Sequence, residues 1–111
     1  MFEGKMDRNS QIKLNEAMVY FMPTDHKHVG CFRCNPEAEG DKHIRAKFER
    51  WLMYRKESIP VCTEMKFVNG KGKPDLVLPL TMDIEEILVS EKQERFEAKD
   101  YSPFKVKGIR I

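Results

Sequence analysis

Between residues 41 and 56 the apolar positions recur every three or four residues, which is the period of an amphipathic helix. They form one stripe that consists of Ile44, Phe48, Trp51 and Leu52. Asp41 stands directly after Gly40, where an acidic side chain suits the N-cap or the first turn of a helix. The pattern therefore predicts a helix over residues 41–56.

After residue 60 the apolar positions alternate or form short runs, and both patterns are typical of strands. The predicted strands cover residues 61–68, 75–80, 84–89 and 104–111. Pro79 is expected at the end of its strand or at a bulge. Ser90 and Gln93 have the spacing of a capping box, which predicts a helix that runs to about residue 100. Gly108 interrupts the alternation of the last strand, so we expect a bulge there.

The first forty residues show no comparable pattern. Residues 9–21 fit a short helix or a strand, and the apolar run 18–21, which Pro23 stops, suits an edge strand. The N-terminus has no hydrophobic stretch of the kind found in signal peptides. No run in the chain approaches the roughly 20 apolar residues that cross a bilayer. We therefore expect a cytoplasmic protein without a membrane partner.

The order of the elements predicts an α/β fold with a mixed sheet. Three strands that are close in sequence can form a meander, and the helix after them can cross over to a fourth strand that lies parallel to the third. The chain has 111 residues, which suits one domain. We expect an N-terminal extension over residues 1–40 and a core over residues 41–111.

The net charge of +2 is too small to indicate nucleic-acid binding by itself. Between residues 41 and 56, however, six basic residues are offset by two acids, which leaves a local charge of +4. The basic residues are Lys42, Arg45, Lys47, Arg50, Arg55 and Lys56, and the acids are Asp41 and Glu49. This distribution fits an ordinary solvated helix face, or a surface that follows a phosphate backbone.

Two carboxylates stand in the otherwise apolar strands, Asp75 at the start of one and Glu86 inside the next. Because side chains alternate along strands, the two can share one face of the sheet. At that distance they repel each other unless a cation lies between them. Mg²⁺ and Mn²⁺ are commonly bound by one or two carboxylates together with water and substrate phosphate. Glu64 and Glu85 are interpreted as solvated strand positions.

Several short motifs follow one another along the chain. They are Cys31-Phe32-Arg33-Cys34, then Glu39, His43 and Lys47 at helical spacing, then Pro74-Asp75, and then Glu86-Ile87-Leu88-Val89-Ser90. In their order and spacing the chain from residue 37 onward resembles the PD-(D/E)XK nuclease superfamily, closest to its competence-protein CoiA-like branch. The resemblance implies a restriction-endonuclease-like core.

The resemblance also implies roles for individual residues. Asp75 and Glu86 would bind Mg²⁺ or Mn²⁺ with help from Glu39. The helix would contact phosphates through His43, Arg45, Lys47 and Arg50. The chain departs from the family at Leu88, where a lysine or glutamine usually stands two residues after the glutamate. We expect Lys92 to supply the missing cation, and the alternatives are Lys47, Lys66 and Lys99.

A loop before the helix carries four side chains that suit zinc: His26, His28, Cys31 and Cys34. They fall within nine residues, which is closer than in standard zinc modules. The expected structural Zn²⁺ site therefore uses both cysteines with His26 or His28, and His43 can join them as a further ligand. The alternative is a loop that binds no metal. Cys62, in a predicted strand, is expected to be a small buried residue.

These observations favour a metal-dependent nuclease that hydrolyses DNA and contacts its backbone with little sequence specificity. Leu88 keeps a second hypothesis open, in which the same fold is a catalytically inactive nucleic-acid-binding module. A third hypothesis is a small zinc-stabilised adaptor that binds another protein. A homodimer is an expectation by analogy with small nucleases that must span both DNA strands.

Overall fold

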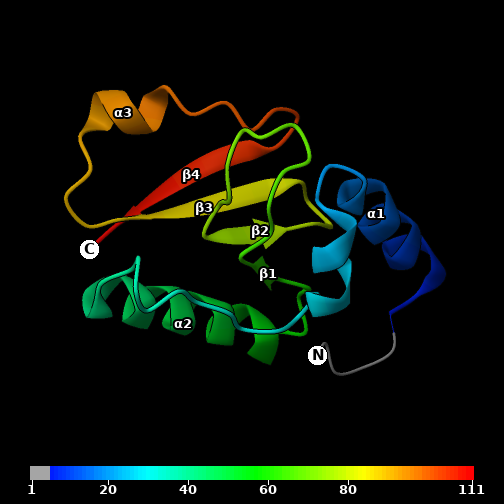
Figure 1. The fold of residues 1–111 in the computed structure, drawn as a ribbon. Helices are drawn as coiled ribbons and strands as arrows, with labels where there is room; N and C mark the ends of the chain where they lie inside the picture. The colour runs from blue at the N-terminus through cyan, green and yellow to red at the C-terminus, as the bar shows by residue number, and fades with distance from the viewer. Residues whose placement is uncertain (1–5) are drawn as a thin grey trace.

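A computed structural model describes residues 6–111 of the chain. The elements are α1 Arg8–Met18, η1 Pro23–His28, α2 Asp41–Lys56, β1 Cys62–Thr63, β2 Leu76–Leu78, β3 Asp83–Leu88, α3 Gln93–Glu97 and β4 Lys105–Arg110. Figure 1 shows the strands as one sheet, with α2 along one side of it and α3 beside β4. Within the described residues, no helix has the length and apolar character needed to cross a bilayer.

The sheet has four strands in the order β1-β2-β3-β4. The first three are antiparallel neighbours, and β4 lies parallel to β3 after a connection that contains α3. This confirms the predicted meander, the crossover and the mixed sheet. Leu76 of β2 pairs with Glu85 of β3, so the next step of this register sets Asp75 opposite Glu86.

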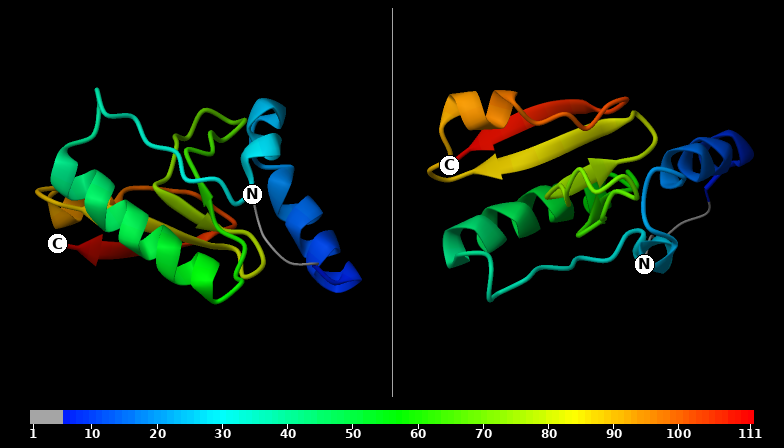
Figure 2. Two further views of the ribbon diagram at one scale, coloured as in Figure 1. Left: turned by 90° about the horizontal axis from the view of Figure 1, so that it is seen from below. Right: turned by 45° about the horizontal axis from the view of Figure 1, so that its top comes forward.

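One face of the sheet is covered by α2, as both views in Figure 2 show. Gly40 is the N-cap of α2 and Asp41 lies in its first turn, which is one of the two positions expected for it. Trp51 of α2 shares a core with apolar side chains of the sheet, namely Val61, Leu76, Leu78 and Ile87. Because strand side chains alternate, Glu86 lies on the face opposite α2.

A second core ties α1 to the remainder of the chain. It includes Leu14 and Met18 of α1 together with Phe21, Phe67, Tyr101 and Phe104. The rings of Phe67 and Tyr101 stack with their centroids 5.2 Å apart. Aromatic packing of this kind fixes ring positions as well as burying apolar area. Tyr101 is therefore held rigidly next to the sheet.

The apolar run 18–21 is not an edge strand. The helix α1 continues to Met18, and Phe21 alone forms a bridge, with Phe67. Of the two alternatives for residues 9–21, the helix is confirmed. The α1 N-terminus is capped by Asp7, whose side chain accepts the Ser10 backbone N–H at 2.7 Å.

The predicted strand over residues 61–68 is much shorter in the structure. Only Cys62–Thr63 pairs with β2, because Glu64 has a positive φ of 57° and bends the chain away from the sheet. A non-glycine residue in that conformation is strained and needs local contacts to hold it. The carboxylate of Glu64 has such contacts, and they belong to the candidate site described below.

Two expectations for the C-terminal part are wrong. The helix α3 has Lys92 as its N-cap with no side-chain hydrogen bond, so Ser90 and Gln93 do not form a capping box. The strand β4 has no bulge at Gly108, which pairs regularly with Glu86. A Cβ atom at Gly108 would lie 2.6 Å from Leu88 Cδ1 and 3.0 Å from the ring of Phe96. A side chain at position 108 would have to displace Leu88 or Phe96, so close packing, and not a change in strand geometry, accounts for the glycine.

Gly108→Ala should therefore destabilise the protein by about 1–3 kcal/mol, the usual cost of adding a methyl group to a filled space. Urea unfolding followed by tryptophan fluorescence measures the change. Lys107→Ala, at the exposed neighbouring position, is the control and should stay within about 0.5 kcal/mol of wild type. Equal effects of the two substitutions would contradict the packing explanation.

Candidate active site

An open pocket of about 910 Å³ lies next to the point where β2 begins and β3 ends. Carboxylates from several segments line it: Glu39, Glu64, Asp75, Glu86 and Glu91. Four cationic side chains line it as well: Lys73, Lys92, Lys99 and Arg95. His43 of α2 adds an imidazole. This concentration of charge is unusual for a chain whose net charge is only +2.

Asp75 is locked into the sheet by its own side chain. Its Oδ2 accepts the backbone N–H of Ile87 at 2.7 Å, and its backbone N–H donates to Glu86 Oε2 at 3.2 Å. Because β2 starts only at Leu76, the carboxylate satisfies a β3 amide at the place where strand pairing has ended. The structure thus brings Asp75 and Glu86 together, as the alternation of the strands predicts.

Glu86 is almost fully buried, with 5% of its surface exposed. Tyr101 donates its hydroxyl hydrogen to Glu86 Oε1 at 3.0 Å, and Lys99 Nζ lies 3.4 Å from the same oxygen. Burial, followed by the negative charge of Asp75, raises the pKa of Glu86 to about 7, while Lys99 and Tyr101 act in the opposite direction. Burial and the charge of Glu86 also raise the pKa of Tyr101. A nearby cation would therefore stabilise the ionised form of the Glu86 carboxylate.

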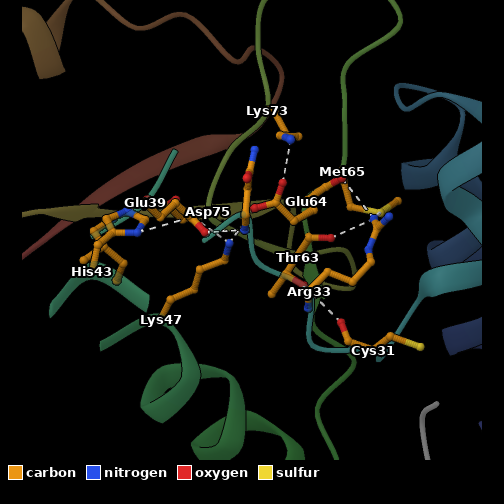
Figure 3. A network of polar contacts seen from close by, with 12 residues as sticks. Cys31, Arg33, Glu39, His43, Lys47, Thr63, Glu64, Met65, Lys73 and Asp75 are labelled. Carbon is orange, nitrogen blue, oxygen red and sulfur yellow. Dashed lines mark hydrogen bonds and ion pairs between the residues drawn. The ribbon is translucent and has the colours of Figure 1, made fainter. Parts of the chain in front are cut away.

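Glu39, His43 and Asp75 form the tightest group of potential metal ligands (Figure 3). His43 Nε2 lies 3.2 Å from Asp75 Oδ2, and His43 Nδ1 lies 3.3 Å from Glu39 Oε1. One ligand atom from each residue falls within 4.8 Å of the others, and no other such group is found among residues 6–111. His43 reaches the site from the first turn of α2 and Glu39 from the loop just before it, so the predicted pairing of these residues with Asp75 is present.

The donor set fits a divalent cation. Carboxylate oxygens suit Mg²⁺ and Mn²⁺, and an added imidazole favours a transition metal such as Mn²⁺ over Mg²⁺. His43 Nδ1 is buried, and its 3.3 Å contact with Glu39 Oε1 lacks the geometry of a hydrogen bond, which is rare for a buried polar atom. A cation held by Glu39, His43 and Asp75 would also offset the repulsion between Asp75 and Glu86.

Lys47 is completely buried, with 0% of its surface exposed. Its Nζ donates to Glu39 Oε1 at 2.9 Å and to Glu64 Oε1 at 2.7 Å (Figure 3). Burial alone would lower the pKa of Lys47, but the hydrogen bonds to Glu64 and Glu39 outweigh it, and the pKa lies above its usual value. Lys73 makes a further ion pair with Glu64, at 2.6 Å. Lys47 therefore holds Glu39 in place and is not exposed to substrate phosphates.

Arg50 of α2, which is partly exposed, forms an ion pair with the buried Glu85 of β3. The guanidinium donates to both carboxylate oxygens of Glu85 at 2.9 and 2.8 Å, and Tyr54 donates its hydroxyl to the same carboxylate. Burial raises the pKa of Tyr54 to about 12, with Glu85 as the next cause. Glu85 is only 3% exposed, so the prediction that it is solvated is wrong. Glu64 is likewise paired and only partly exposed, which corrects the same prediction for that residue.

The remaining predicted residues lie apart. Arg45 is exposed and lines a separate shallow groove on α2. Lys92 is exposed at the rim of the site pocket, where no ion pair within residues 6–111 joins it to Glu86. The cation next to Glu86 is Lys99, and Leu88 is buried against the β4 backbone at Gly108. Sequence spacing alone does not single out Lys99, because the chain between α3 and β4 has no regular period.

The cysteine loop is attached to the sheet through Arg33, which stands between Cys31 and Cys34. The backbone N–H of Arg33 donates to Thr63 Oγ1 at 2.7 Å, and its guanidinium donates to the Thr63 and Glu64 carbonyl oxygens, both at 2.9 Å. His26 Nε2 lies 3.1 Å from the Phe21 carbonyl oxygen. The four residues expected to bind zinc (His26, His28, Cys31 and Cys34) do not form a ligand group in the described chain, and the zinc site stays a prediction.

Comparisons with known proteins assign neither a family nor a fold to the chain. No family model, no curated protein and no solved structure matches this chain.

Removing the charge of Lys47 should destabilise the fold strongly, because Glu39 and Glu64 would keep negative charges without their shared partner. For Lys47→Met we expect a loss of about 3–5 kcal/mol in the free energy of unfolding. Lys42→Met, at an exposed position of the same helix, is the matched control and should change it by about 0.5 kcal/mol or less. If the two substitutions have similar effects, Lys47 does not hold the site together.

Mn²⁺ should stabilise the protein by binding the folded state only. At a concentration about 100-fold above its dissociation constant, the expected gain is about 2.7 kcal/mol, and the melting temperature should rise by several degrees. Differential scanning fluorimetry of EDTA-treated protein measures this rise. Asp75→Asn should abolish it, since the amide oxygen can still accept the Ile87 N–H but carries no charge. Asp41→Asn, an exposed control, should keep it, and a rise that survives Asp75→Asn would place the metal elsewhere.

Proposed function

We propose that this chain is a metal-dependent nuclease that hydrolyses DNA phosphodiester bonds on a restriction-endonuclease-like core of the PD-(D/E)XK type. The observation that carries the proposal is the convergence of Asp75, Glu86 and Lys99 in one open pocket. These are an aspartate, a glutamate and a lysine, the three side-chain types that the motif resemblance requires. The order of helix, antiparallel meander, helix and parallel strand supports the same core.

The roles divide between holding a cation and handling the reacting groups. Asp75, Glu39 and His43 would hold Mn²⁺ or Mg²⁺, with Glu86 as a further carboxylate beside Asp75. When bound, such a cation lowers the pKa of a water molecule and offsets the charge that develops on the phosphate. Lys99 supplies a positive charge that Leu88 cannot, and Tyr101 orients the Glu86 carboxylate through its hydrogen bond.

The site also suits the electrostatics of the reaction. Buried carboxylates repel a phosphodiester anion, so cleavage requires positive charge close by. Lys47 and Lys73 already neutralise Glu64 and Glu39, which leaves Asp75 and Glu86 as the acids with the greatest need for a cation. The arrangement therefore favours binding of a divalent ion and a phosphate together over binding of either alone.

A catalytically inactive nucleic-acid-binding module is the second candidate. It is favoured by the position of Lys99, whose Nζ lies 3.4 Å from Glu86 and 3.2 Å from a carboxylate oxygen of Glu91. A lysine shared by two acids has less charge available for a transition state. The two candidates predict the same DNA binding and differ only in cleavage.

The test is cleavage of fluorescent single-stranded, duplex and branched DNA in Mn²⁺, in Mg²⁺ and in EDTA. Asp75→Asn, Glu86→Gln and Lys99→Met should each reduce the metal-dependent rate about 100-fold or more, which is typical for loss of a group that acts in the transition state. Asp41→Asn and Glu49→Gln, exposed acids on α2, are the matched controls and should retain the wild-type rate.

Cleavage that survives in Asp75→Asn and Glu86→Gln would come from another site or from a contaminant, and would contradict the proposal. DNA binding by a wild-type protein that does not cleave in either metal would favour the inactive module.

A further inference from the structure

The residues expected to hold the substrate backbone are largely unavailable for that task. Lys47 is buried between Glu39 and Glu64, and Arg50 is bound to Glu85 beneath α2. Arg45 lines a groove that shares no residue with the site pocket. A DNA strand in the pocket therefore needs other cations for its phosphates.

Two of the four cations that line the pocket are already neutralised. Lys73 is paired with Glu64 at 2.6 Å, and Lys99 is paired with Glu86 and Glu91. Lys92 and Arg95 remain. The Arg95 side chain is 84% exposed, and its only ion pair within residues 6–111 is a distant one of 3.9 Å to Glu91.

The segment that carries Lys92 and Arg95 is anchored on both sides. Arg110 of β4 donates to the backbone carbonyl of Glu91 at 3.1 Å and to the Gln93 side chain at 2.8 Å. Phe96, next to Arg95, packs against Gly108 so closely that a Cβ there would meet its ring at 3.0 Å. The segment that carries the two cations is thus tied to β4, and both side chains line the pocket.

We infer that Lys92 and Arg95 form a phosphate-binding site for the backbone of a DNA strand whose scissile phosphate lies over Asp75 and Glu86. This inference rests on the proposed function for the position of the scissile phosphate. Acidic and basic side chains occupy different parts of the pocket. The acids bind the cation, and the basic side chains on the connection from β3 to β4 attract the next phosphates of the same DNA strand. Such a site reads no base sequence, because contacts to phosphates carry no sequence information.

The test compares two exposed basic pairs of equal charge. In the pocket-pair variant Lys92→Gln is combined with Arg95→Gln, and in the control, the α1-pair variant, Arg8→Gln is combined with Lys13→Gln at exposed positions of α1. Binding of fluorescein-labelled oligonucleotides, single-stranded and duplex, is followed by anisotropy in EDTA over a range of salt concentrations, so that no cleavage occurs.

The pocket-pair variant should bind DNA about tenfold or more weakly than the wild type. The slope of log K against log salt should be smaller in magnitude by about 1.4 to 1.8, as expected for two lost phosphate contacts. The α1-pair variant should leave both values close to wild type. The charge-conserving exchange of Lys92→Arg with Arg95→Lys should restore binding, which a merely structural role would not predict. Thermal unfolding of every variant checks that the fold is intact.

The outcomes separate this inference from the proposed nuclease. If the wild-type protein binds DNA through Lys92 and Arg95 but does not cleave it, the nuclease proposal fails and the binding site stands. If it cleaves in Mn²⁺ while the pocket pair leaves KM and binding unchanged, the binding site is wrong and the nuclease stands. Loss of binding in the α1-pair variant alone, or no DNA binding by the wild type, would also overturn the inference.

Discussion

The hydrogen bond from the Ile87 amide to the Asp75 carboxylate is the contact on which the site depends. A buried strand amide must have an acceptor, and β2 offers no carbonyl at that position because it begins one residue after Asp75. The carboxylate fills this place in the ladder, and the same bond aims Asp75 at Glu86 and His43. A structural requirement of the sheet thus positions the charged group of Asp75 at the start of β2.

Ion pairs near Asp75 link several segments of the chain. Lys47 joins Glu39 to Glu64, and Lys99 joins Glu86 to Glu91, so a lysine holds each of these four acids, whereas the ion-pair partner of Asp75 within residues 6–111 is His43. Such pairs contribute little net stability when they are compared with apolar packing, but breaking one partner is costly. Their effect is to place carboxylates accurately, and accurate placement is what a cation site requires.

The alternation of the strands predicts from the sequence that Asp75 and Glu86 can share one face. The register of β2 with β3 in the structure then sets the two residues opposite each other. The burial of Lys47 could not be predicted, since a lysine on a charged helix is expected in solvent and only tertiary contacts with Glu39 and Glu64 reverse this. Glu85 was misassigned for the same reason. Lys99 lies in an irregular segment, where sequence distance does not determine which side chain it reaches.

The most direct test of a shared cation site is a crystal structure of the protein grown with Mn²⁺ and analysed for anomalous scattering. The account predicts one strong peak bound by Asp75 together with Glu39 or His43, on the side of the pocket that also holds Glu86. A peak confined to the cysteine loop, or a well-ordered pocket with no peak at saturating Mn²⁺, would contradict it.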